Sequence, residues 1–170
     1  MKRRIALIST GGTIEKTYDE LSGVLANQVS VLDFMLATLE IRGVSIQRVS
    51  LMNKDSLEMS DDDHGLIARV AGEQAAQHDG VVVVHGTDRL AVSGERVVAL
   101  WGTPASPVAF TGAMRPYELR DSDALQNLTE ALMAAQLLPA GVYVVMHGQV
   151  LQFPGVVKDP GQGSFVMRPS

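Results

Sequence analysis

Two short stretches of this chain carry side chains that could act together in nucleophilic catalysis. The first, Thr10 to Thr13 (TGGT), follows the apolar run Ile5 to Ser9, and the second, His85 to Asp88 (HGTD), follows four consecutive valines. Apolar runs of this length are typical of strands buried on both faces of a parallel sheet. A threonine hydroxyl is a weak nucleophile that needs a base or a polarising neighbour. Thr13 and Thr87, beside a carboxylate, are therefore the candidates for that role.

An amine and a glycine turn would complete an acyl-transfer site. Lys158 supplies an amine that could act as a base if its surroundings lower its pKa. Asp88 could orient that lysine or bind a substrate ammonium, and the N–H groups of the Gly-Gly turn could form an oxyanion hole. Because the chain has no cysteine, it has no thiol nucleophile. A phosphate site is disfavoured, because TGGT lacks the Walker lysine and the dinucleotide spacing.

Alternating strands and helices must position these side chains. The four valines form the central strand, and apolar runs predict the other strands at 5–9, 44–52, 107–110 and 141–146. Helical spacing predicts helices in the intervals at 30–43, 60–78, 88–101 and 121–138. Five such alternations imply right-handed crossovers. We predict an α/β fold with a three-layer, doubly wound, mainly parallel five-stranded sheet of flavodoxin-like order and helices on both faces.

The helix starts have recognisable caps. Ser30 with Asp33 resembles a capping box, with Gly43 as the stop signal, and Asp88 is placed to cap the helix through Trp101. Ser60 precedes three aspartates, which the helix dipole favours in a first turn. We interpret these aspartates as helix charges and predict no metal site.

The same alternation predicts where the polar residues meet. Ligands of open α/β sheets bind outside the carboxyl ends of the strands. Polar residues follow four of the predicted strands, and in strand order they are Thr10 to Thr13, Asp55-Ser56, Thr87-Asp88 and, by a longer path after the fifth strand, Lys158. The turn Ala113-Met114 follows the fourth strand. We expect them to converge at one edge of the sheet.

Composition narrows the function class. The 170 residues, 46% apolar and 19% charged, fit one globular domain spanning 1–170, with no linker or repeat. The net charge of −5 argues against a nucleic-acid surface. No stretch is long and apolar enough for a membrane span or signal peptide. We expect a cytoplasmic protein with a small-molecule substrate.

The two catalytic stretches resemble the signature motifs of the bacterial-type L-asparaginases, the threonine amidohydrolases. Further similarity lies in Phe110 to Pro116 (FTGAMRP), Asp55 to Met59 (DSLEM), Val157 to Asp159 (VKD) and Asp123 to Leu128 (DALQNL). The resemblance therefore covers nearly the whole chain. Two such motifs in order, each after a strand, are specific, whereas either one alone would be weak.

The resemblance implies a cofactor-free L-asparaginase that forms a homo-oligomer, a dimer or tetramer. Thr13 would attack the side-chain amide of L-asparagine, or more weakly L-glutamine. Thr87, Lys158 and Asp88 would activate the nucleophile or the water. Tyr18 would assist Thr13 from a mobile loop, with Glu15 or Glu20 as alternatives. The substrate would be held by Gly12, Asp55, Ser56, Gly86, Asp88 and Ala113.

The sequence also departs from the family pattern. The family's second domain, which supplies a substrate-binding acid to a neighbouring subunit, has no counterpart in these 170 residues, so we expect a single catalytic domain. Arg89 stands where the family often has threonine, and Leu57 where it often has a polar residue. Three alternatives remain: another amidohydrolase on the same machinery that acts on glutamine or a modified asparagine, a non-catalytic amino-acid sensor that keeps the pocket, and an amidotransferase-type subunit that needs a partner. A sensor would bind aspartate without turnover, and a subunit would be inactive alone.

Overall fold

The centre of the molecule is a six-stranded sheet in the order β4-β1-β5-β6-β7-β8. A computed structural model describes all of residues 1–170. The first five of these strands run parallel, in the flavodoxin-like order predicted from the sequence, and β8 pairs with β7 antiparallel. The sheet strands are β1 (Arg3–Gly11), β4 (Val44–Lys54), β5 (Gly80–Val84), β6 (Val108–Thr111), β7 (Val142–Met146) and β8 (Gln149–Gln152).

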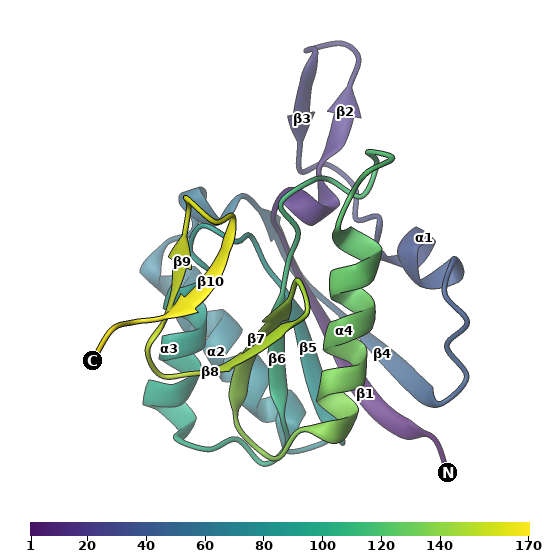
Figure 1. Cartoon of the computed structure of the whole chain (residues 1–170). Coiled ribbons are helices and arrows are strands. Elements are labelled where there is room, and N and C mark those ends of the chain that lie inside the picture. The colour runs from purple at the N-terminus through teal and green to yellow at the C-terminus, as the bar shows by residue number, and fades with distance from the viewer.

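Helices cover both faces of this sheet and make three layers (Figure 1). One core cluster joins the sheet to α2 and α3, and the other joins its opposite face to α1 and α4. Every residue of β5 is buried, which explains the run of valines, since both of its faces pack against helices. The helices are α1 (Leu32–Ala37), α2 (Asp61–Ala75), α3 (Leu90–Trp101) and α4 (Ala124–Leu137). None is both long and apolar enough to cross a membrane.

Two hairpins lie beyond the carboxyl ends of the parallel strands. One consists of β2 (Thr17–Asp19) and β3 (Val24–Ala26), which project from the sheet at the top of Figure 1. The other consists of β9 (Val156–Asp159) and β10 (Ser164–Met167). Short 3-10 helices follow two strands at the same edge, η1 (Thr13–Glu15) after β1 and η2 (Ser56–Glu58) after β4. The segments β8, β9 and β10 were not predicted from the sequence.

Two predicted helix starts are wrong. Ser30 donates its hydroxyl hydrogen bond to the buried Glu15 carboxylate, so α1 begins after Val31 without a side-chain cap and ends six residues before Gly43. Asp88 does not cap α3, because its carboxylate binds the Lys158 ammonium and Arg89 occupies the cap position. Asp88 thus takes a charged partner in preference to a helix N–H. Ser30 binds the Glu15 carboxylate and also accepts the Leu32 N–H at 3.4 Å, but it lies one residue before the cap position.

The predicted start of α2 is confirmed in detail. The Ser60 hydroxyl accepts the Asp63 N–H at 3.2 Å, and the Asp63 carboxylate accepts the Ser60 N–H at 2.9 Å, which is a complete capping box. Asp63 also binds Lys54 at 2.9 Å, so it joins the helix start to the end of β4. Asp63, one of the three aspartates of the first turn, therefore has a structural role.

Candidate active site

Three turns meet at the carboxyl edge of the sheet, and glycines make the approach possible. A Cβ on Gly12 would lie 2.5 Å from the Gly86 Cα, and a Cβ on Gly86 would lie 2.7 Å from the Ser56 Oγ. Gly12 also has a φ of 87°, a conformation that residues with a Cβ rarely adopt. Both the close contact and the backbone conformation therefore disfavour a larger residue at this position. The loops after β1, β4 and β5 are therefore in direct contact, as their positions in the sequence predicted.

Lys158 reaches this junction from β9. Its Nζ donates to Thr87 Oγ1 at 2.9 Å and to Asp88 Oδ1 at 2.5 Å. The lysine side chain is mostly buried, at 15% exposure, whereas the Asp88 side chain is 47% exposed. The Asp88 side chain thus faces solvent, and its carboxylate is accessible to a positively charged group. The hydroxyl, amine and carboxylate that the sequence suggested do lie together.

Thr13 lies at the first position of η1, directly after Gly12. It is partly buried, and its hydroxyl makes no hydrogen bond within the protein. The Gly12 N–H donates to Lys54 O at 2.9 Å, so the suggested use of that N–H in an oxyanion hole is wrong. The Thr87 N–H, in contrast, has no acceptor in the protein. A free hydroxyl and a free N–H therefore remain at the two turns.

Ser56 and Asp55 border the same junction from the end of β4. The Ser56 side chain is buried, and its Oγ accepts the Arg89 N–H at 3.2 Å. Asp55 caps η2 and receives the Lys16 ammonium at 2.8 Å. The hydrogen bond from Lys16, followed by that from the Leu57 N–H, lowers the pKa of Asp55 below its usual value. Asp55 is therefore an anion with its own partner, while the Ser56 hydroxyl proton is free to donate.

Tyr18 lies on the projecting β2–β3 hairpin, and no hydrogen bond joins it to Thr13. The residue is 58% exposed, and its backbone N–H donates to Glu118 Oε2 at 2.6 Å. Glu15 is buried against Ser30, and burial raises the pKa of its carboxyl. The structure therefore does not bring Tyr18 or Glu15 to the Thr13 hydroxyl, and Glu20 is exposed on the same hairpin.

The turn after β6 forms another wall of the junction. Ala113 is buried, and a Cβ on Gly112 would lie 2.4 Å from the His85 carbonyl oxygen. The next residue, Met114, places its sulfur 3.7 Å from the Thr87 hydroxyl, which donates to it. The turn is thus in contact with the loop that carries Thr87.

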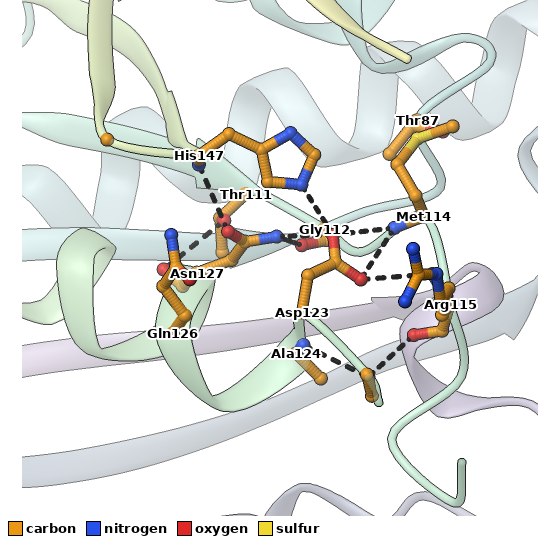
Figure 2. Close-up of polar contacts among 12 residues, drawn as sticks. Thr87, Thr111, Gly112, Met114, Arg115, Asp123, Ala124, Gln126, Asn127 and His147 are labelled. Atoms are coloured by element: carbon orange, nitrogen blue, oxygen red, sulfur yellow. Dashed lines mark hydrogen bonds and ion pairs between the residues drawn. The ribbon is translucent and has the colours of Figure 1, made fainter. Parts of the chain in front are cut away.

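Asp123 fixes this turn, a role that the sequence did not predict (Figure 2). Its carboxylate accepts the Met114 N–H at 3.0 Å, the Arg115 N–H at 3.0 Å and the His147 Nε2–H at 2.6 Å. Asn127, one turn further along α4, donates to the same carboxylate at 2.9 Å and to Gly112 O at 2.9 Å. The similarity of DALQNL to the family was the available signal, but it indicated only a helix.

The negative charge of the Asp123 carboxylate is favoured by the N–H groups that donate to it. Burial acts to raise its pKa, but hydrogen bonds from the Met114 N–H, His147 and the Arg115 N–H bring the pKa below its usual value. His147 has a φ of 55°, an unusual conformation for a residue other than glycine, and its N–H donates to Asn127 Oδ1 at 3.1 Å. Asp123 is therefore the acceptor around which the ends of β6 and β7 are held.

The sequence of this chain is similar to a known protein family and to several named proteins. Residues 4–160 match the family model "Asparaginase, N-terminal". The chain is 36% identical over 149 residues to a glutamyl-tRNA(Gln) amidotransferase subunit of Haloquadratum walsbyi, an alignment that covers 84% of this chain and 33% of that protein. Several other relatives bear the same name.

Solved structures of L-asparaginases share the fold. The thermostable L-asparaginase from Thermococcus kodakarensis is 30% identical with a TM-score of 0.85, covering 96% of this chain and 51% of that chain. The "Probable Cytoplasmic L-asparaginase" from Campylobacter jejuni is 29% identical with a TM-score of 0.79, covering 98% and 52%. The chain thus spans about half the length of these structures and a third of that of the amidotransferase subunit. With a family match over most of its residues, the chain belongs to the asparaginase family, matching its N-terminal region.

Proposed function

We propose that this chain carries the catalytic site of an L-asparaginase with Thr13 as its nucleophile. The observation that carries the proposal is the contact of Lys158 with both Thr87 and Asp88, next to the turn that bears a free Thr13 hydroxyl. Membership of the asparaginase family supports an amidohydrolase, and the contacts of Lys158 bring a hydroxyl, an amine and a carboxylate together.

The reaction would take place in two steps. Thr13 Oγ attacks the side-chain amide carbon of L-asparagine, its proton passes to the amide nitrogen, and the C–N bond breaks. Ammonia leaves, and an acyl-threonine ester remains. Water then attacks the ester carbon, and L-aspartate leaves as Thr13 recovers its proton. Thr87 and Lys158 would move the proton to and from the attacking oxygen, and Asp88 would hold Lys158. The Thr87 N–H would donate to the oxyanion.

The remaining polar groups would hold the substrate backbone. The exposed oxygen of Asp88 would receive the α-ammonium, and the Ser56 hydroxyl would donate to the α-carboxylate. Gly12, Gly86 and Ala113 would line the pocket by close backbone approach, and Asp55 would orient Lys16 beside it. Tyr18 would reach the site only if the β2–β3 hairpin moved, so we assign it no step. The scheme uses groups of this chain alone.

The location and assembly of the protein extend this proposal. The likeness to the structure named "Probable Cytoplasmic L-asparaginase" supports a cytoplasmic enzyme. A homo-oligomer remains our expectation from the family resemblance, with L-asparagine preferred to L-glutamine.

One second function has a specific observation in its favour. Several relatives are named as a subunit of a glutamyl-tRNA(Gln) amidotransferase, and the H. walsbyi protein has the higher identity, 36% against 30% for the T. kodakarensis structure. The same Thr13 chemistry would then release ammonia for use by a partner. Such a chain would show little turnover of free amino acids on its own.

The experiment compares ammonia release from L-asparagine and L-glutamine by the wild type, Thr13→Ala and Thr13→Ser. We expect wild-type turnover, a loss of at least about 10³-fold in Thr13→Ala, and partial activity in Thr13→Ser, which keeps a hydroxyl. Circular dichroism would verify that both variants fold. Undiminished activity in Thr13→Ala would exclude the nucleophile assignment. Absence of wild-type turnover, with aspartate still bound, would favour a sensor or an amidotransferase component.

A further inference from the structure

Three fully buried polar side chains lie end to end beneath the Gly86 turn. His64 of α2 has its Nδ1 2.7 Å from the Oγ of Ser93 in α3. The same Oγ is 2.8 Å from the Nε2 of His85, and His85 Nδ1 is 2.7 Å from Gly86 O. All three side chains are 0% exposed. None of them has a part in the chemistry described above.

The contact between His85 Nδ1 and Gly86 O determines which atom of each side chain carries the proton. Gly86 O can only accept, so His85 Nδ1 must carry the proton. His85 is neutral, since burial lowers its pKa to about 4, and its Nε2 is therefore an acceptor. The Ser93 hydroxyl must then donate to His85 Nε2. Its oxygen in turn accepts from His64, which carries its proton on Nδ1.

We propose that His64, Ser93 and His85 form a hydrogen-bond relay of one fixed direction that holds the peptide between Gly86 and Thr87 in its active orientation. The relay joins α2 and α3 to the turn after β5. Both histidines are positioning residues and carry a single tautomer, with hydrogen on Nδ1.

The consequence for the site comes from peptide geometry. The bond between Gly86 and Thr87 is trans, so its carbonyl and its N–H point in opposite directions. Because the carbonyl is held by the His85 ring, the Thr87 N–H points away from that ring, and it has no acceptor in the protein. In this respect the inference rests on the proposed function, which uses that N–H as an oxyanion donor.

Stability alone does not account for the relay. The Nε2 of His64 is buried without any partner, and an unpaired buried acceptor costs stability. The charged groups that act on this ring are Arg89, Arg96, Asp61 and Asp63, and burial, as the largest cause, lowers its pKa. An apolar side chain at position 64 would avoid the unpaired atom but could not donate to Ser93.

The first test reads the tautomers directly. Long-range ¹H–¹⁵N correlation spectra of the wild type, recorded from pH 6 to 8, distinguish protonated from unprotonated imidazole nitrogens for the chain's four histidines. His64→Asn and His85→Asn assign the signals. We expect His64 and His85 each to show a protonated Nδ1 and a bare Nε2, unchanged across this range. A proton on Nε2 of either ring would overturn the proposal.

The second test breaks the relay with Ser93→Ala and uses Ser106→Ala as the matched control. Ser106 is also a buried serine, but its hydroxyl donates to Ala75 O at 2.9 Å, away from the relay. We expect Ser93→Ala to lower kcat by about 10-fold to 100-fold with little change in KM, because a small misplacement of a catalytic group is costly. It should also shift the Thr87 amide resonance and mix the tautomers.

Ser106→Ala should lower Tm about as much as Ser93→Ala does. It should leave kcat, the Thr87 amide resonance and the histidine tautomers unchanged. Within the relay, His64→Asn should keep more activity than His64→Leu, because the Asn side-chain amide can donate from the position of Nδ1. If Ser93→Ala and Ser106→Ala had equal effects on kcat and on the Thr87 amide resonance, the proposed relay would be excluded. If the wild type released no ammonia, the proposed function would fail, while the tautomers and the Thr87 resonance would still decide this inference.

Discussion

Lys158 and Thr87 are 71 residues apart in the chain, yet the Lys158 Nζ lies 2.9 Å from the Thr87 Oγ1. Thr87 follows the central strand β5, whereas Lys158 comes from β9, in a hairpin outside the main sheet. This contact joins the C-terminal hairpin to the turn after a fully buried strand. It makes the β9–β10 hairpin part of the site.

Replacement of Lys158 by Met should abolish most activity and leave the fold intact. The change removes the amine that contacts both Thr87 and Asp88, and general acid–base groups contribute about 10²-fold to 10⁴-fold to rate. Ammonia release at saturating L-asparagine measures the loss. Arg42→Met, which removes a cation from the exposed pair with Glu40, is the control and should retain full activity. A Lys158→Met enzyme with wild-type kcat would exclude a catalytic role for this lysine.

Replacement of Asp123 by Asn should destabilise the protein and loosen the Met114 turn. An amide presents fewer acceptor sites to the N–H groups of Met114 and Arg115, so we expect a loss of about 1–3 kcal/mol in unfolding free energy. Urea unfolding at pH 7 measures it. Asp121→Asn, in an exposed pair with Arg115, is the matched control and should change stability by less than about 1 kcal/mol.

The Asp123 variant also gives a pH test. Because the pKa of Asp123 is lowered in the folded protein, its stabilising charge is present above the unfolded value near 4 and is lost as the pH falls through the folded value. The stability difference between wild type and Asp123→Asn should therefore narrow as the pH is lowered from 5 to 3. A difference that widens in acid would contradict the assigned contacts.

His85 should make the protein less stable in mild acid. Its pKa falls from 6.5 to about 4 on folding, so the unfolded chain binds the proton first as the pH drops below 6.5. The stability lost to this group between pH 7 and pH 5 should be about 2 kcal/mol. His85→Asn, which cannot titrate, should show a correspondingly flatter pH dependence in urea unfolding. Since the raised pKa of Glu15 acts in the opposite sense, the comparison of the two proteins is decisive rather than the wild-type curve alone.

Two helical glycines should respond in opposite ways to alanine. A Cβ on Gly94 of α3 would lie 2.3 Å from the Phe153 ring, so Gly94→Ala should lower the unfolding free energy by about 1–3 kcal/mol through overpacking. A Cβ on Gly65 of α2 would meet only an Arg96 nitrogen at 3.7 Å, so Gly65→Ala should raise it by about 0.5–1 kcal/mol through helix propensity. Thermal unfolding measures the stability of both variants, and Tm should fall in Gly94→Ala and rise in Gly65→Ala. Equal shifts would mean that the contact with Phe153 is readily relieved.

The sequence by itself determined the parallel sheet, its order and the edge at which polar residues gather. Apolar runs such as Val81 to Val84 can be satisfied only by burial on both faces, and the glycine turns after β1 and β5 mark the ends of strands. The capping box of Ser60 and Asp63 was predictable because both partners lie within one helical turn.

Only the tertiary structure decided which side chains are partners across long distances in the chain. Ser30 and Asp88 looked like helix caps, but Glu15 and Lys158 compete for them with buried or charged contacts that no local pattern reveals. Asp123 was predicted only as part of a helix, yet it holds the turn after β6, and the His64–Ser93–His85 relay spans three elements. The physical reason is that local spacing fixes hydrogen bonds within a turn or helix, whereas burial and charge select partners only after the chain has packed.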